Sequence, residues 1–272
     1  MDYIGRFSFT AGRMFLGFVA LVPFFFIFEF KKVMKDRLSL KIIFIYLFFL
    51  GFLLCGGNAL QQYSLLYTDV ANAAIFTIFY VLIVPVLSYY LFSKKIHWSV
   101  WPAVLVCIVG GFLLTELDNI TVRLGDTLVL LGAFFWAFHI VFISKFLKIF
   151  NYPMTIAMGQ CLLGSLIAFV PSIAMENVSL ANLLMEKEEL LYAGVLSSGI
   201  AFLLQIYSQQ NLSPAPVAII FSLEGVFAAI FGWILLSQFL SGMKIFGIIL
   251  ILSAVIFSQL SPTYDKRKYG RS

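Results

Sequence analysis

The sequence is poor in charge, cysteine and histidine. Only 11% of its 272 residues are charged and 62% are hydrophobic, whereas a soluble domain carries about 25% charged residues. Water is therefore not the solvent for most of this surface, and we predict contact with a lipid bilayer. The net charge of +5 does not indicate a nucleic-acid partner, because the basic residues stand in short runs between apolar stretches.

Chemistry-bearing motifs are also missing. Cys55, Cys107 and Cys161 lie within apolar segments and lack metal-ligand spacing, which is typical of buried, unpaired cysteines. The sequence has no phosphate-binding loop with lysine, no His-Glu pair at i,i+4 and no nucleophile elbow. The histidines, His97 and His139, fall on different segments. We predict that the protein is not an enzyme and uses no cofactor or metal.

Long apolar runs are what the sequence has in abundance. A bilayer core of about 30 Å requires about 20 apolar residues per helix. Nine segments meet this requirement: residues 9–30, 42–64, 70–92, 97–115, 124–146, 152–175, 190–210, 213–237 and 243–260. Backbone groups in lipid must be satisfied internally, so such continuous segments favour helices over barrel strands. The predicted fold class is all-α, a polytopic transmembrane helical bundle.

Lysine and arginine predict the orientation of these helices. Thirteen of the eighteen basic residues lie in connectors 31–41, 93–96 and 145–149 and in the tail 261–272. One consistent threading places these segments in the cytoplasm, and acidic residues collect on the other side. The connector between Gln209 and Ser213 is on the cytoplasmic side without a basic residue. We predict an integral protein of the plasma or bacterial inner membrane with a cytoplasmic C-terminus.

The chain repeats itself after 144 residues. Seven identities fall within sixteen positions: Leu60, Gln61, Tyr63, Ser64, Ala71, Ala74 and Ile75 recur as Leu204, Gln205, Tyr207, Ser208, Ala215, Ala218 and Ile219. Residues 1–115 form a first repeat of four helices, without the counterpart of segment 124–146, and residues 124–260 form a second repeat of five. Because five crossings leave the chain on the opposite side of the membrane, the second repeat is predicted to be inverted relative to the first, as in many secondary transporters.

The residues of one helix resemble a known family. The run from Phe221 to Gln238 (FSLEGVFAAIFGWILLSQ) resembles the penultimate helix of EamA-type members of the drug/metabolite transporter superfamily, and Phe79–Pro85 (FYVLIVP) resembles its partner in the first repeat. The resemblance extends over essentially the whole chain. It implies ten helices in a 5 + 5 arrangement, both termini in the cytoplasm, and export of amino acids or other metabolites.

The chain departs from the family pattern in three places. The family's opening helix is absent, so that Met1 is expected to be an internal methionine used as the start. Gly225 stands where a proline is usual after the glutamate, and Gln238 stands where an acid often ends the helix.

Glu224 is the most informative single residue. It lies in the middle of segment 213–237, where an ionised side chain costs at least about 2.5 kcal/mol, so it must face a cavity or a partner. Proton coupling, binding of a substrate amine and a purely structural hydrogen bond are the alternatives. Its mate in the first repeat is Tyr80, and pseudo-symmetry would set the two on opposite walls of one cavity.

Polar residues on other segments complete the predicted substrate site. Gln61 and Gln205 are matched by the repeat, and Ser208 extends a small polar stripe that begins at Ser197; such a stripe lines a wet cavity or a close helix contact. Asn58 is a weaker candidate of the same kind. Pro85 and Pro216 each interrupt a repeat-related helix, although Pro216 also fits a helix start.

Three further residues complete the candidates. Trp136 and His139 share a helix face near the midplane. Trp136 is either an aromatic wall of a pocket or a packing or lipid-facing residue, and His139, whose type titrates near neutral pH, is a candidate for proton coupling and gating. Arg13 lies one turn inside the outer end of its helix, either snorkelling or acting as a gate or anion contact. It is the only cation deep in any segment, which disfavours phosphorylated substrates.

The leading hypothesis is an alternating-access exporter of small organic metabolites, such as amino acids or drug-like solutes. The alternatives are a non-transporting membrane scaffold or assembly subunit and an inactive truncated transporter. A wet central cavity that carries Glu224 separates the first hypothesis from the others. Proton coupling and a homodimer stay open, as do the substrate and the direction of transport.

Overall fold

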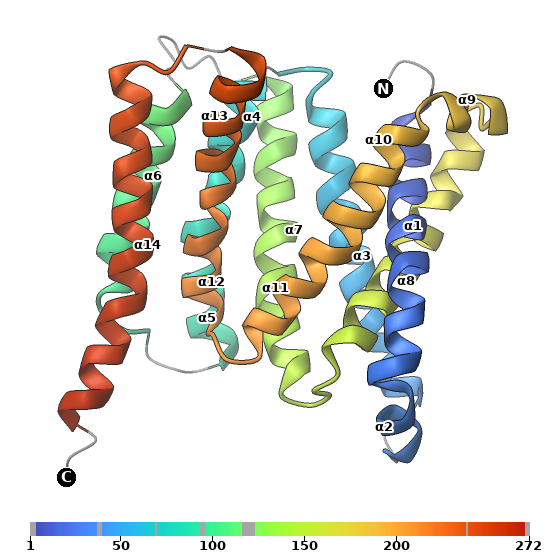
Figure 1. The fold of residues 1–272 in the computed structure, drawn as a ribbon, viewed down its shortest axis with the longest axis horizontal. Helices are drawn as coiled ribbons and strands as arrows, with labels where there is room; N and C mark the ends of the chain where they lie inside the picture. Colours follow the sequence, from blue (N-terminus) through green and yellow to red (C-terminus); the bar gives the residue numbers. More distant parts are fainter. Residues whose placement is uncertain are drawn as a thin grey trace. The chain divides into compact units, whose positions relative to one another are not determined.

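The computed structural model describes residues 4–36, 40–68, 70–92, 96–115, 123–237 and 239–269. Every regular element in these ranges is a helix (Figure 1). In chain order they are α1 (Arg6–Phe28), α2 (Phe30–Lys35), α3 (Leu40–Ser64), α4 (Val70–Ile78), α5 (Tyr80–Phe92), α6 (Val100–Thr115), α7 (Leu124–Leu147), α8 (Pro153–Met175), α9 (Leu180–Met185), α10 (Lys187–Leu191), η1 (Tyr192–Ala201), α11 (Phe202–Gln209), α12 (Pro214–Phe221), α13 (Leu223–Leu236) and α14 (Gly242–Tyr269).

The predicted all-α membrane fold is confirmed. Seven of the described helical stretches are long and apolar enough to cross a membrane, and two shorter apolar helices cover Phe76–Leu91 and Val100–Thr115. These nine stretches coincide with the nine predicted segments. At the C-terminus α14 continues to Tyr269, so the segment expected to be a tail from residue 261 is helical through Tyr269.

Three predicted segments are not single regular α-helices. Segment 70–92 is broken at Phe79 and segment 213–237 is broken at Ser222. Segment 190–210 contains η1, a π-helix of ten residues. Such wide turns are rare and often mark functional sites.

The helices form two compact units, each discontinuous in sequence. Unit 1 comprises Met1–Tyr63 and Phe142–Asn211, and unit 2 comprises Ser64–Val141 and Leu212–Ser272. Each unit therefore combines helices of the first predicted repeat with helices of the second.

In unit 1 the N-terminus of α8 is capped by a side chain from the end of α1. The carboxylate of Glu29, the residue that follows α1, accepts hydrogen bonds from the backbone N–H groups of Met154 (2.9 Å) and Thr155 (2.8 Å) and from the Thr155 hydroxyl (2.8 Å). Glu29 is only 5% exposed. The four first N–H groups of a helix have no partner within the helix, and a negative charge there also complements the helix dipole.

The opposite end of the same helix pair repeats this arrangement. Glu176, the residue that follows α8, accepts from the backbone N–H groups of Phe7 (2.9 Å) and Ser8 (2.8 Å) and from the Ser8 hydroxyl (2.6 Å). A Cβ atom at Gly5 would overlap the Glu176 carboxylate, which would have to move away from its hydrogen-bond donors. Each helix thus ends in a carboxylate that caps the other, and α1 and α8 run antiparallel.

The interior of unit 1 combines aromatic stacking with a close approach of helices. The rings of Tyr46 and Phe146 stack with centroids 4.6 Å apart, and the Phe146 and Phe150 centroids lie 5.5 Å apart. Where α1 crosses η1, a Cβ atom at Gly17 would lie 3.0–3.1 Å from backbone atoms of η1. Small residues allow this contact, as expected for membrane helices.

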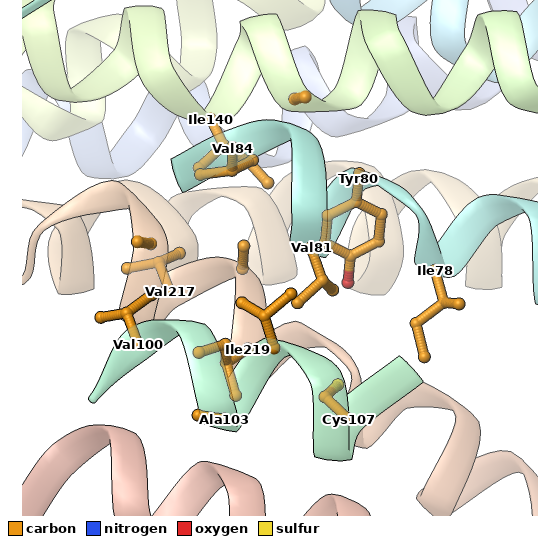
Figure 2. Close-up of a cluster of buried hydrophobic side chains, with 14 of the residues drawn as sticks. Ile78, Tyr80, Val81, Val84, Val100, Ala103, Cys107, Ile140, Val217 and Ile219 are labelled. Atoms are coloured by element: carbon orange, nitrogen blue, oxygen red, sulfur yellow. The ribbon is translucent and has the colours of Figure 1, made fainter. Parts of the chain in front are cut away.

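Unit 2 is built around a second antiparallel pair, α6 and α14. Gly110 of α6 faces Gly247 and Ile251 of α14, and Gly247 in turn faces Leu113 and Leu114. Moving along α6 from Gly110 to Leu114, the facing residue in α14 moves back from Ile251 to Gly247, so the two helices run in opposite directions. Against this pair lies a hydrophobic cluster of residues from α4, α5, α6, α7, α12 and α14 (Figure 2).

Candidate functional site

Two broken helices of unit 2 meet in this cluster. The break between α4 and α5 is at Phe79, the break between α12 and α13 is at Ser222, and α12 packs against α5. The breaks are not at the prolines that the sequence suggested. Pro85 lies inside α5, and Pro216 lies in the first turn of α12, where proline is tolerated.

Hydroxyl groups that bond to the backbone lie at or near both breaks. Ser222 donates its hydroxyl to the Ile219 carbonyl (2.5 Å), and two residues before the other break Thr77 donates to the Ala73 carbonyl (2.8 Å). Such bonds compete with the backbone ladder and bend helices. At the start of α5 the Phe79 carbonyl accepts from two N–H groups, those of residues 82 and 83 (3.0 and 3.1 Å).

Tyr80 is the first residue after the break in α4–α5. It is only 8% exposed, and Figure 2 shows its ring within the cluster with the hydroxyl directed toward the helix that carries Cys107. Tyr80 lies within electrostatic range of both Glu224 and Cys107. Cys107 in turn lies close to the side chain of Ser222, at the second break. Tyr80 and Glu224 therefore lie in the same part of unit 2; that they form opposite walls of one cavity stays a prediction.

Glu224 lies in the first turn of α13, two residues after the second break. It is the eleventh of the 22 residues in the span Pro214–Leu235, and its side chain is exposed. The N-terminal end of a helix favours negative charge, so the break provides a setting for an ionised carboxylate at mid-span. This geometry differs from an acid buried within the bundle for packing alone.

Trp136 and His139 of α7 border the same cluster. Trp136 is partly buried and packs against it. His139 is fully buried, and its ring contacts that of Trp136 edge-on at a centroid distance of 6.2 Å. Trp136 therefore packs against the cluster that contains Tyr80, whereas His139 is not on an exposed surface.

Arg13 belongs to unit 1 and points into it rather than along the helix toward its outer end. Its guanidinium donates to the hydroxyls of Ser198 (Nε, 2.9 Å) and Ser197 (Nη2, 2.8 Å), both in η1. The interpretation as a snorkelling residue is therefore wrong. The predicted polar stripe consists of Ser197, Ala201, Gln205 and Ser208. Ser197 contacts Arg13 of α1, whereas Ala201 is exposed and Gln205 is buried, so the four residues do not share one surface.

Two further predicted residues of unit 1 form hydrogen bonds within their own helices. Asn58 is buried and donates its amide to the Leu54 carbonyl (2.8 Å), and Ser208 donates its hydroxyl to the Gln205 carbonyl (2.7 Å). Gln61 is half-buried. In the part of the chain that the structure describes, no group of three or more His, Cys, Asp or Glu side chains is arranged to hold a metal.

Sequence reasoning missed the two capping glutamates and the serine at the second break. A signal for the caps was present, since Glu29 and Glu176 have the same spacing as Ser8 and Thr155. That spacing is 147 residues, whereas the other repeat positions are 144 residues apart, so these two pairs do not align at the 144-residue shift.

Comparison with known proteins decides the family. The model of the EamA-like transporter family matches two stretches, residues 1–116 and 123–260. The chain belongs to the EamA-like transporter family. The matched stretches lie close to the predicted repeats 1–115 and 124–260. Family membership and the apolar helices together identify an integral membrane transporter, which handles a small solute in a lipid environment.

Similar proteins carry the same description. An uncharacterized transporter of Archaeoglobus fulgidus is 28% identical over 264 residues, which cover 96% of this chain and 79% of that protein. The uncharacterized transporter YoaV of Bacillus subtilis is 27% identical over 272 residues, which cover 96% of this chain and 88% of YoaV. A solved crystal structure matches 94% of this EamA-like chain with a TM-score of 0.79 at 15% identity, which supports the fold.

Proposed function

We propose that this EamA-like protein is a secondary transporter that exports small organic solutes by alternating access, and that the helix breaks beside Tyr80 and Glu224 hold the solute. The observation that carries the proposal is the pair of discontinuous helices in unit 2 with a carboxylate at mid-span. Transporters commonly bind their substrates where discontinuous membrane helices expose backbone polar groups and helix ends.

The charge at the breaks supports a solute that carries an amine. Glu224 contributes a carboxylate, and the described helices α4, α5, α6, α12 and α13 contain no lysine or arginine. An ammonium group can form a charge-assisted hydrogen bond with Glu224. A phosphorylated or otherwise anionic solute would find no counter-charge on these helices.

The aromatic and apolar surroundings support an organic body on the same solute. Tyr80 is a member of one largely aliphatic cluster, and the partly buried Trp136 and Phe221 pack against it. Aromatic and apolar walls with few polar groups are typical of small-molecule sites. The proposed substrate class is therefore an amine-bearing metabolite or drug-like cation with an apolar part.

Alternating access is supported by the antiparallel helix pairs. Within unit 1 the reciprocal caps relate α1 to α8, and within unit 2 the glycine contact relates α6 to α14. In each pair one helix comes from each predicted repeat, as inverted repeats require. In inverted-repeat transporters one repeat-related bundle moves against the other around a fixed site. The basic connectors support a cytoplasmic C-terminus in a plasma or bacterial inner membrane.

Transport by proteoliposomes tests the proposal. Purified protein is reconstituted and a panel of amine-bearing solutes is assayed for exchange, with and without a pH gradient. We expect exchange of at least one solute, and Glu224→Gln should weaken its binding by about 1.5–3 kcal/mol, which is a factor of about 10 to 150 in Kd. The matched control is Glu188→Gln, the same change at an exposed position of α10.

The outcomes separate the roles of Glu224. Loss of pH-gradient dependence with exchange retained would assign proton coupling rather than amine binding. Unchanged exchange and unchanged pH dependence would make Glu224 structural. Absence of transport for every solute, by a protein that is folded in the liposomes, would favour the membrane scaffold.

A further inference from the structure

A short helix at one end of unit 1 is held in a defined position. The helix α2 is separated from α1 only by Glu29, and the Glu29 carboxylate is fixed by the three hydrogen bonds that cap α8. From the inner side of α2, Val33 packs against the hydrophobic core of unit 1. Since α1 is a membrane span that ends at Phe28 and the next span begins at Leu40, α2 lies at the membrane surface.

Apolar side chains of α2 face away from the unit. Phe30 is 37% exposed and Met34 is 62% exposed. The Phe30 ring is packed against that of Phe26, with centroids 5.1 Å apart, and against that of Phe25 at 6.0 Å. This aromatic contact continues the apolar surface of α1 onto α2. Aromatic residues at this depth are typical of the interface between hydrocarbon and headgroups.

The same helix presents three lysines. Lys31, Lys32 and Lys35 are exposed, and none of them forms an ion pair with a residue in the described ranges. The two neighbouring acids are already engaged: Glu29 is buried in the α8 cap, and Asp36 accepts a hydrogen bond from the Tyr152 hydroxyl (2.6 Å). The positive charge of α2 is therefore directed outward and is not used within unit 1.

We propose that α2, with its lysines Lys31, Lys32 and Lys35 and its apolar residues Phe30 and Met34, is a docking surface for an anionic phospholipid of the bilayer. Basic residues beside apolar ones on an interfacial helix are the combination that binds anionic lipid surfaces. Positive charge alone would serve membrane topology. Membrane topology requires neither a helix held in place by the buried Glu29 carboxylate nor apolar side chains beside the lysines.

Lipid-dependent thermal unfolding of the full chain tests this proposal. Purified protein in detergent is titrated with phosphatidylglycerol or with phosphatidylcholine, and apparent affinities are taken from the rise in Tm. We expect tighter binding of phosphatidylglycerol. Each lysine at the surface contributes about fivefold at low salt, so the triple variant K31Q/K32Q/K35Q should lose on the order of a hundredfold. High salt should reduce the difference.

The control has the same charge change elsewhere. The variant K266Q/R267Q/K268Q removes three positive charges from the C-terminal segment and should keep the phosphatidylglycerol preference, and so should K31R/K32R/K35R. If the triple glutamine variant fails to insert, the single variants K31Q, K32Q and K35Q should each lose about fivefold.

Three results would overturn the proposal. The first is an unchanged phosphatidylglycerol preference in all of the glutamine variants of α2. The second is an equal loss in the C-terminal control, which would mean that net charge alone matters. The third is a rise in Tm with excess inorganic phosphate that equals the rise with phosphatidylglycerol, which would mean a site for free anions.

Discussion

The reciprocal caps of α1 and α8 predict unequal stability losses at two chemically similar glutamates. In Glu29→Gln the charge is removed and one of the two acceptor oxygens becomes an N–H donor. The three donors on Met154 and Thr155 then share a single neutral acceptor, in a place where Glu29 is 5% exposed. In Glu176→Gln the same change occurs at a half-buried site.

The magnitude follows from the hydrogen bonds and the burial. A hydrogen bond to a charged group contributes about 1.5–3 kcal/mol, and a buried donor left without an acceptor costs about 1–3 kcal/mol. For Glu29→Gln we expect loss of at least one such bond, or about 2–3 kcal/mol. For Glu176→Gln water can replace the lost acceptor, so we expect the usual cost of a lost cap, about 1 kcal/mol.

The assay is the free energy of unfolding of the purified protein and both variants, measured under one condition that allows reversible unfolding in mixed micelles. Glu29→Gln should destabilise the protein more than Glu176→Gln. Equal losses, or a loss below about 0.5 kcal/mol for Glu29→Gln, would refute the argument that burial makes this cap strong.

Three further predictions concern topology, packing and titration. A cysteine that replaces Ser39 should resist membrane-impermeant thiol reagents added outside intact cells; ready labelling would reverse the orientation. Gly17→Val should destabilise unit 1 by about 1–3 kcal/mol, because its side chain would collide with the backbone of η1; thermal unfolding measures this, and an unchanged Tm would contradict it. The hydrogen bond to the Asp36 carboxylate raises the pKa of the Tyr152 phenol above 10.0. The contribution of this hydrogen bond to stability is therefore present below about pH 10 and is lost as the pH rises through the raised pKa. Asp36→Asn should lower the pKa of Tyr152 in an absorbance titration, and an unchanged titration would disprove the coupling.

The helices could be predicted because the bilayer leaves few alternatives. A run such as segment 124–146 is too long and too apolar for another fold, so its span appears directly in the sequence. The repeat also sets Tyr80 and Glu224 at equivalent positions, and a cavity between them stays a prediction. In the structure the two lie within electrostatic range of each other.

The details that depend on hydrogen bonding could not be predicted in the same way. Pro85 drew attention as a helix breaker, whereas the break occurs at Phe79, after the back-bonding Thr77. The role of Glu29 depends on the N-terminus of a helix 125 residues further along the chain. For Arg13 the sequence left snorkelling and a gate or anion contact open, because no sequence pattern indicates that a π-helix presents two serines to it.

The central claim is that Glu224 faces a wet solute pathway that opens to each side of the membrane in turn. The most direct measurement uses a cysteine at Ala228, an exposed residue one turn beyond Glu224 in α13, with the three buried native cysteines replaced by alanine. Reactivity toward a membrane-impermeant thiol reagent is measured in right-side-out and in inside-out vesicles. We predict labelling from both sides, slowed by a transported amine; labelling from neither side, with reaction only toward a lipid-soluble reagent, would place this face in lipid and contradict the claim.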